Sequence, residues 1–192
     1  MQLYIFLKVK MHRDFNITIF GKFLRNEQTQ NGKARLKYSY MVMQDVNFEL
    51  FADSVEAECS FGIRNPDLDF VQSTMDKLDL LPYRKHHPNT LSGGQKQRVA
   101  VAVSMICGKE VLVFDEPTSG LDFDSMAQVA ELIKELAAMG KVIFIVTHDY
   151  EFVCRTCSRI LHIDQGKPCD ELRVSEAAEK QIRELFSIAG TI

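Results

Sequence analysis

The stretch from Leu91 to Asp122, LSGGQKQRVAVAVSMICGKEVLVFDEPTSGLD, opens with a glycine turn that leads into a helical run. The turn is Ser92-Gly93-Gly94, and the pattern predicts a helix from Gln95 to about Cys107. A helix start offers free backbone N–H groups and the positive end of the helix dipole, which together suit a phosphate. Glycine lets the backbone approach such an anion without a Cβ in the way. The turn therefore predicts an anion-facing helix tip.

The second half of this stretch predicts a strand that ends on two carboxylates. Val111 to Phe114 is short and apolar, and Asp115 and Glu116 follow it directly. Ligands of open α/β folds bind at the carboxyl edge of the sheet. There Asp115 could hold Mg²⁺, directly or through water, and Glu116 could orient or deprotonate an attacking water. Taken singly these signals are weak, because a Ser-Gly-Gly turn is commonly a loop and an Asp-Glu pair is commonly solvated surface.

The two halves, taken together and in this order, are a far more specific signal than either half alone. LSGGQKQR followed by VLVFDEPTSGLD resembles the nucleotide-binding domain of ATP-binding cassette (ABC) proteins. The resemblance implies an α/β fold like that of the phosphate-loop NTPases, with a mostly parallel sheet and a helical insert. It also implies a dimer in which two cassettes sandwich two ATP molecules with Mg²⁺. Each site then takes the phosphate loop, Gln, Asp-Glu and His from one chain and the Ser-Gly-Gly-Gln signature from the other.

The same resemblance implies a role for each matching residue. Asp115 handles Mg²⁺, and Glu116 polarises the attacking water. Gln44 reaches Mg²⁺ and that water, and His148, at the end of the apolar strand KVIFIVTHD (141–149), contacts the γ-phosphate. Without the resemblance, a strand-end glutamine or histidine reads as a structural residue. The residues expected to cap the nucleotide of the partner, or to link the two sites, are Ser92, Gly93, Gly94, Gln95 and Asp122.

Residues 1–30 depart from the family pattern. The phosphate loop, G-x-x-x-x-G-K-[ST], grips the β- and γ-phosphates with backbone amides and a lysine, and this motif occurs nowhere in the sequence. Gly-Lys pairs stand at 21–22 and 32–33, but Phe23 and Ala34 follow them where a hydroxyl residue is needed. Apolar and polar residues alternate in this region well enough for one or two strands.

The resemblance resumes near Asn31 and extends to the C-terminus. We therefore divide the chain into an atypical segment, 1–30, and an ABC ATPase domain, 31–192, whose helical subdomain covers about 53–107. The phosphate-loop unit is absent or replaced. Residues 1–30 are either a divergent replacement or the product of a truncated or frame-disrupted gene.

Hydrophobic periodicity predicts the remaining elements. Phe48, Leu50 and Phe51 are either a docking surface for a membrane partner or part of the core. Leu78, Leu80 and Leu81 supply an apolar face in the helical insert. The predicted elements are a buried strand from Lys37 to Met43 that ends at Gln44, helical pieces at 54–61 and 67–78, a core helix at 123–139 that stops at Gly140, a hairpin at 159–168, and an amphipathic helix at 175–186.

Composition limits the class of protein. A length of 192 residues makes one domain the default. A net charge of −3 gives no basic field for nucleic acid, and no apolar run approaches a bilayer span. The start, MQLYIFLKVK, lacks the features of a signal peptide. Five scattered cysteines fit a reducing compartment, with Cys154-x-x-Cys157 interpreted as two residues on one helix face. The expected location is cytoplasmic, peripheral on the inner face of the cell membrane.

The sequence MVMQDVNFELFADSV (41–55) most resembles that of the ATPases of energy-coupling factor importers. The first functional prediction is therefore an ATP-binding and ATP-hydrolysing subunit of such an importer, paired with a second cassette and a transmembrane coupling protein. The second is a degenerate subunit that only lends its signature to an intact partner, and the third is a gene product without function. Without a phosphate loop, the isolated chain is expected to bind ATP very weakly.

Overall fold

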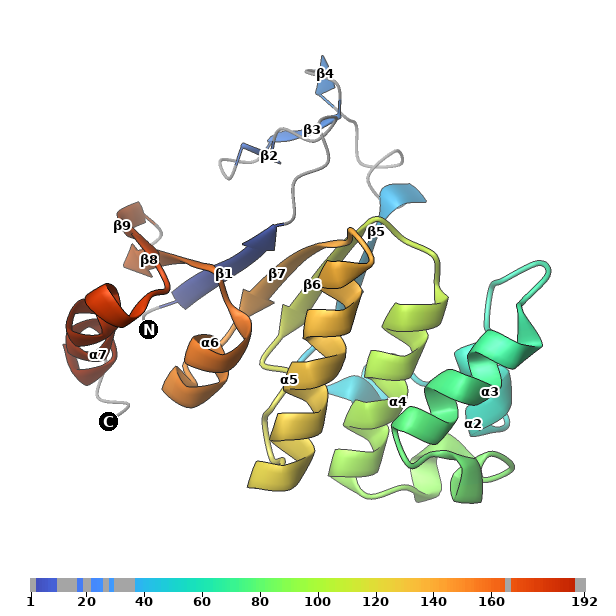
Figure 1. Cartoon of the computed structure of the whole chain (residues 1–192). Coiled ribbons are helices and arrows are strands. Elements are labelled where there is room, and N and C mark those ends of the chain that lie inside the picture. The colour runs from blue at the N-terminus through green and yellow to red at the C-terminus, as the bar shows by residue number, and fades with distance from the viewer. Residues whose placement is uncertain are drawn as a thin grey trace.

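The computed structural model describes residues 3–9, 17–18, 22–25, 28–29, 37–164 and 167–188. Its centre is a six-stranded sheet in the order β5-β6-β7-β1-β8-β9 (Figure 1). The strands, in sheet order, are β5 (Ser39–Val42), β6 (Val111–Asp115), β7 (Val142–Val146), β1 (Leu3–Val9), β8 (Arg159–Asp164) and β9 (Lys167–Arg173). A small antiparallel sheet contains β2 (Ile17–Thr18), β3 (Lys22–Arg25) and β4 (Gln28–Thr29).

The predicted α/β class is confirmed, and parallel pairing occupies the half of the sheet that carries the candidate site. Strands β5, β6 and β7 are parallel neighbours. Strand β1 is antiparallel to both β7 and β8, and β8 and β9 form the predicted hairpin. The β1–β7 register runs from Ile5 opposite Val146 to Val9 opposite Val142. Strand β1 therefore ends at the amino edge of β7, away from the edge that carries Asp115.

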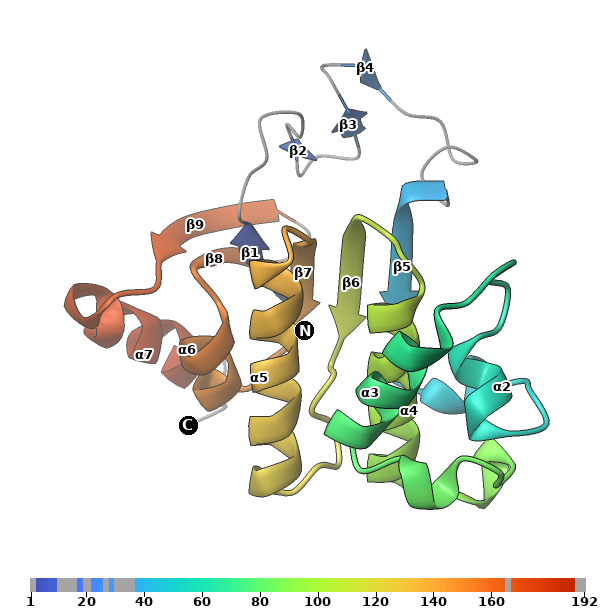
Figure 2. The same cartoon turned by 45° about the vertical axis from the view of Figure 1, so that its right-hand side comes forward.

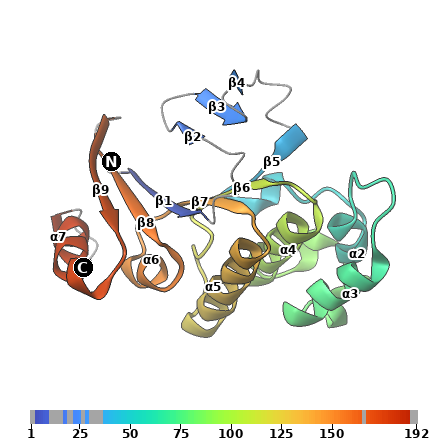
Figure 3. The same cartoon turned by 45° about the horizontal axis from the view of Figure 1, so that its top comes forward.

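The helices within the described ranges pack mainly against one face of this sheet. Figure 3 shows α4 (Gly93–Ile106), α5 (Phe123–Ala138) and α6 (Tyr150–Thr156) on one side of the sheet and the small β2–β3–β4 sheet on the other. Helices α2 (Val55–Cys59) and α3 (Leu68–Lys77) both contact α4 and form the helical insert (Figure 2). The closing helix α7 (Glu179–Ile188) follows a short 3₁₀ turn, Glu176–Ala178.

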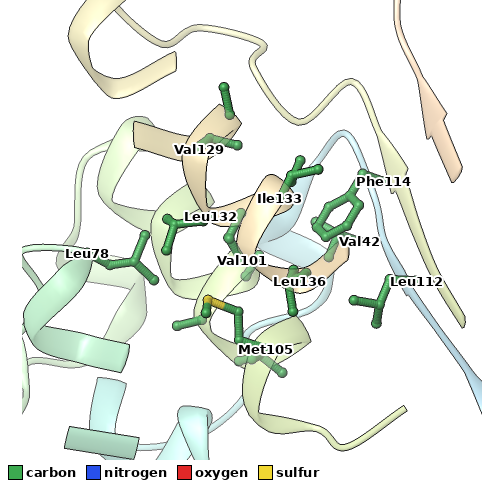
Figure 4. Close-up of a cluster of buried hydrophobic side chains, with 14 of the residues drawn as sticks. Val42, Leu78, Val101, Met105, Leu112, Phe114, Val129, Leu132, Ile133 and Leu136 are labelled. Atoms are coloured by element: carbon green, nitrogen blue, oxygen red, sulfur yellow. The ribbon is translucent and has the colours of Figure 1, made fainter. Parts of the chain in front are cut away.

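The core lies between the sheet and helices α4 and α5. Register partners Val42, Phe114 and Ile145 point to the same face, and all three are fully buried. Figure 4 shows Val42, Leu112 and Phe114 of the strands beside Ile133 and Leu136 of α5. On the other face of β7, Phe144 and Val146 are only partly buried. Val142 on that face is 3% exposed, so β7 is partly buried on this face and completely buried on the helix-covered face.

The predicted α5 helix is confirmed by its ends and by its apolar stripe. Asp122 caps its start, because the Asp122 carboxylate accepts a hydrogen bond from the Ser125 N–H at 2.8 Å. Gly140, just beyond the end, has a φ of +85°, a left-handed conformation that glycine adopts freely. The buried stripe is Met126, Val129, Leu132, Ile133 and Leu136.

Two local predictions need correction, and one alternative left open by the sequence is resolved in part. The strand predicted from Lys37 begins only at Ser39, because the residues at 37–38 are helical. This strand is at the edge of the sheet, and Met41 is 49% exposed, so it is not a buried strand. Leu50 is a core residue, 5% exposed, whereas Phe51 is 69% exposed, and the Phe48 side chain lies outside the described part of the structure.

The two cysteines of the C-x-x-C pair do not share one environment. Cys154 is exposed on α6, and Cys157, at the end of that helix, is buried. Within the described part of the chain, no group of three or more His, Cys, Asp or Glu side chains is arranged to hold a metal. In the same residues, no helix is both long enough and apolar enough to cross a membrane.

Candidate functional site

The candidate site is built where β6 and β7 end side by side. These strands are parallel, and their register places Asp115 opposite Val146. The residues that follow, Glu116 on one strand and Thr147 and His148 on the other, therefore meet at the carboxyl edge of the sheet. This is the edge at which open α/β folds bind ligands.

Glu116 is held at this edge by four hydrogen bonds. Its N–H donates to the Val146 carbonyl at 2.7 Å, and its own carbonyl accepts from the Ser119 N–H at 3.1 Å. Its carboxylate accepts from the Thr147 hydroxyl at 3.0 Å through Oε2 and contacts His148 Nδ1 at 2.7 Å through Oε1. The Glu116 backbone is left-handed, with a φ of +47°, a conformation that costs a residue other than glycine on the order of 1 kcal/mol. The contacts with β7 and the residues after it offset that cost.

The Glu116–His148 contact fixes one ring nitrogen and leaves the other free to act. An ionised carboxylate only accepts hydrogen bonds, so His148 Nδ1 is the donor. The Glu116 side chain is 16% exposed and the His148 side chain 63% exposed. His148 can therefore reach a ligand in solvent while Glu116 stays shielded beside it.

Asp115 stands next to this pair in an environment that favours a cation. Burial raises the pKa of the Asp115 carboxyl, and the Glu116 carboxylate beside it raises that pKa further. A divalent cation at this point would offset both effects. Carboxylate oxygens are ligands that Mg²⁺ prefers, so the residues present fit that ion.

Gln44 follows β5 at the same edge of the sheet. Val42 is the register partner of Phe114, so Gln44 occupies the position along its strand that Glu116 occupies along β6. The segment around it is anchored by the Met43 N–H, which donates to Glu49 Oε1 at 2.6 Å. It is also anchored by Lys96 Nζ of α4, which donates to Asn47 Oδ1 at 2.6 Å. The Gln44 side chain itself is exposed.

The signature residues form a second group, at the tip of α4. Ser92 caps the helix, and its Oγ accepts from the Gln95 N–H at 3.3 Å while Gln95 Oε1 accepts from the Ser92 N–H at 2.9 Å. A Cβ built on Gly94 would lie 3.3 Å from Leu121 Cδ2, so the tip packs against the turn that precedes Asp122. Asp122 has a lowered pKa because its carboxylate accepts the Ser125 N–H. The structure thus brings the predicted residues together as two groups.

Three polar residues of the site were missed by the sequence analysis. Thr147 is 1% exposed and bonds the Glu116 carboxylate. Asp149 caps α6, and Thr118 Oγ1 donates to Asp149 Oδ2 at 3.5 Å. The available signal was their place in the chain, since Thr118 follows the Asp-Glu pair and Thr147 and Asp149 flank the strand-end histidine. Nothing in the sequence showed that these two turns touch.

The sequence of this chain is similar to known proteins of one family. The sequence model of the ABC transporter family matches residues 7–119. This match begins earlier than the start near Asn31 expected from the motifs. A putative ABC transporter ATP-binding protein of Treponema denticola is 50% identical over 140 residues, which cover 73% of this chain and 29% of that protein. The arginine transport ATP-binding protein ArtP of Escherichia coli is 34% identical over 157 residues, covering 81% and 63% respectively.

A solved structure shows the same fold. CbiO1 of Clostridium perfringens, part of the ABC transporter complex cbiONQ, superposes with a TM-score of 0.65 at 24% identity, over 90% of this chain and 77% of that one. The chain spans less than two thirds of the length of the two relatives described above. The family match, by contrast, covers more than half of the chain itself. The chain therefore belongs to the ABC transporter family.

Proposed function

We propose that this chain is an ATP-binding subunit of an ABC importer that works in a pair with a second cassette and a transmembrane coupling protein. The observation that carries the proposal is the pair of groups at its surface. One is the Glu116–His148 contact at the carboxyl edge, and the other is the exposed glycine tip of α4. In such a pair, Glu116 polarises the attacking water and His148 positions the γ-phosphate.

The remaining site residues take the roles that their positions support. Asp115, with Gln44 at the neighbouring strand end, would hold Mg²⁺, an ion that offsets the phosphate charge. Ser92, Gly93 and Gly94 would cap the nucleotide of the partner, with Gln95 closing the helix tip behind them. Asp122, at the start of α5, would link the two sites.

The finer assignment is an importer of the energy-coupling factor type. The resemblance of the sequence at 41–55 to that group supports it. The exposed Phe51 then belongs to the surface that meets the membrane partner at the inner face of the cell membrane. The division into an atypical 1–30 segment and a cassette domain with a helical insert at about 53–107 is part of the same proposal.

The direction of β1 in the sheet favours a second function. A phosphate loop is useful only at the carboxyl edge of the sheet, but β1 enters the sheet antiparallel and ends at the amino edge of β7. The sequence also holds no G-x-x-x-x-G-K-[ST] motif. The direction of β1 and the absence of this motif favour a degenerate role. In that role the chain contributes only its signature residues and completes the ATP site of an intact partner.

One experiment separates the two functions. ATPase activity is measured on the chain alone, on an intact cassette alone, and on their mixture. If this chain is catalytic, E116Q abolishes the activity that the chain adds to the mixture. If the chain only lends its signature, S92R abolishes the added activity and E116Q leaves it unchanged. Ser73→Arg, on the exposed side of α3, is the control for an added arginine. Unchanged activity on mixing contradicts both functions.

A further inference from the structure

Thr147 is a buried polar residue with two defined hydrogen bonds at the candidate site. Its side chain is 1% exposed. Its Oγ1 lies 3.0 Å from Glu116 Oε2 and 3.1 Å from the backbone nitrogen of Asp149. These two contacts join the end of β7 to the turn after β6 and to the start of α6.

The direction of both bonds follows from their chemistry. A backbone N–H can only donate, so the Thr147 hydroxyl accepts from Asp149. The hydroxyl proton is then directed to Glu116 Oε2. The Thr147 hydroxyl is buried, and its oxygen already accepts the hydrogen bond from the Asp149 N–H. Its proton is therefore held in a fixed direction, toward one oxygen of the Glu116 carboxylate.

The second carboxylate oxygen is held from the other side by His148 Nδ1 at 2.7 Å. Two donors, one buried and one exposed, therefore set the plane of the Glu116 carboxylate. Since an ionised carboxylate has about four lone-pair sites, two remain for a water molecule. His148 is 63% exposed and can move with a ligand, so Thr147 is the donor that stays in place.

We propose that Thr147 is the positioning residue of the Glu116 base: its hydroxyl holds the carboxylate in the orientation from which it polarises water. This inference rests on the proposed function, because it assigns Glu116 the role of base. It goes beyond that function in naming a residue that touches neither nucleotide nor water. It also predicts that the hydroxyl, and not the shape of the side chain, is what the site requires.

The first test measures the environment of His148 by NMR and does not require ATP hydrolysis. Ring ¹⁵N signals of His148 are recorded by NMR in the full chain and in the variants T147V, T147S and E116Q. Valine keeps the shape of threonine and removes the hydroxyl, and serine keeps the hydroxyl. T147V is expected to shift the His148 signals in the same direction as E116Q, because the carboxylate loses its buried anchor. T147S is expected to leave them in place.

Thr156→Val is the matched control for loss of a buried hydroxyl. Thr156 is also 1% exposed, and its hydroxyl donates to the Phe152 carbonyl within α6. This variant is expected to leave the His148 signals unchanged. A folded T147V chain with wild-type His148 signals overturns the inference, as does a T156V chain that shows the same change. If T147V does not fold, T147S decides, since loss of the wild-type signals there contradicts a role for the hydroxyl.

The second test measures turnover in the mixture with an intact cassette. T147V is expected to lower kcat about tenfold with KM unchanged, as for loss of one hydrogen bond to a charged group. T147S is expected to keep the wild-type kcat, because it retains the hydroxyl that acts through Glu116. A wild-type kcat in a folded T147V chain overturns the inference. If E116Q is as active as wild type, the catalytic role proposed for this chain fails, and the His148 signals still decide whether Thr147 positions Glu116.

Discussion

Glu49 shows how a single side chain can make stability depend on pH. Its Oε1 accepts the Met43 N–H at 2.6 Å, and its Oε2 is buried without a hydrogen-bond partner among the described residues. Burial raises the pKa of Glu49 from 4.5 to about 7, and the Met43 hydrogen bond only partly opposes this. The charged form of Glu49 is therefore less favourable in the folded chain than in the unfolded one.

We expect E49Q to remove a pH dependence from the free energy of unfolding. Between pH 4.5 and about 7 the folded wild type binds more protons than the unfolded chain, so its stability falls as pH rises through this window. E49Q should match wild type near pH 4.5 and exceed it at pH 8, by about 1 kcal/mol once solvent screening is allowed for. Urea unfolding at both pH values measures the difference. Glu184→Gln, at an exposed site, is the control, and parallel pH profiles for E49Q and wild type would contradict the expectation.

Helix α4 combines a buried body with an exposed tip, and the two impose different requirements. From Val99 to Ile106 every side chain is buried, because α2, α3, α5 and β5 all contact this helix. At the tip, a Cβ on Gly93 would meet nothing within 4 Å, whereas one on Gly94 would meet Leu121. Neither glycine has a positive φ. Folding alone therefore does not require glycine at position 93.

For this reason Gly93→Ala is expected to raise stability and lower function. Reduced entropy of the unfolded chain should add about 0.4–1 kcal/mol to the free energy of unfolding. The added methyl group stands on the face proposed to approach the nucleotide of the partner, so partner-dependent ATPase activity should fall. Gly94→Ala is the comparison, and its gain in stability should be smaller because the Leu121 side chain must move. Full ATPase activity in the Gly93→Ala mixture would show that this tip does not approach nucleotide.

The elements also show where sequence reasoning succeeds and where it fails. Local patterns suffice for α4, β6 and α5, because their apolar periodicity, caps and glycines all lie within the segment itself. The direction of β1 is different, because alternating residues predict a strand but not its neighbours or its register. Likewise the Thr147–Glu116 bond depends on a left-handed turn at Glu116 and on pairing of two distant strands. Such long-range contacts leave no local signal.

At the scale of the whole molecule, the chain carries both groups of residues of the proposed nucleotide site but no phosphate-loop motif. One group offers carboxylates and a histidine at the sheet edge, and the other offers a helix tip on α4. Loss of three charge-assisted hydrogen bonds from a missing phosphate loop costs about 5 kcal/mol or more, a several-thousand-fold loss in affinity. Affinity for ATP then depends on what a partner adds.

ATP is therefore expected to leave the thermal stability of the isolated chain almost unchanged. A ligand that binds only the folded state stabilises it by RT ln(1 + [L]/Kd). At about 1 mM ATP, a Kd of about 10 mM yields less than about 0.1 kcal/mol, whereas a Kd of about 1 µM yields about 4 kcal/mol. For a chain of this size the second case raises Tm by roughly 8–16 °C, and the first raises it by less than about 1 °C. Melting curves with Mg²⁺ and increasing ATP distinguish the two, with a cassette that contains a phosphate loop as the positive control. A saturable rise in Tm at micromolar ATP would mean that residues of this chain replace the phosphate loop, and the degenerate role would then be wrong.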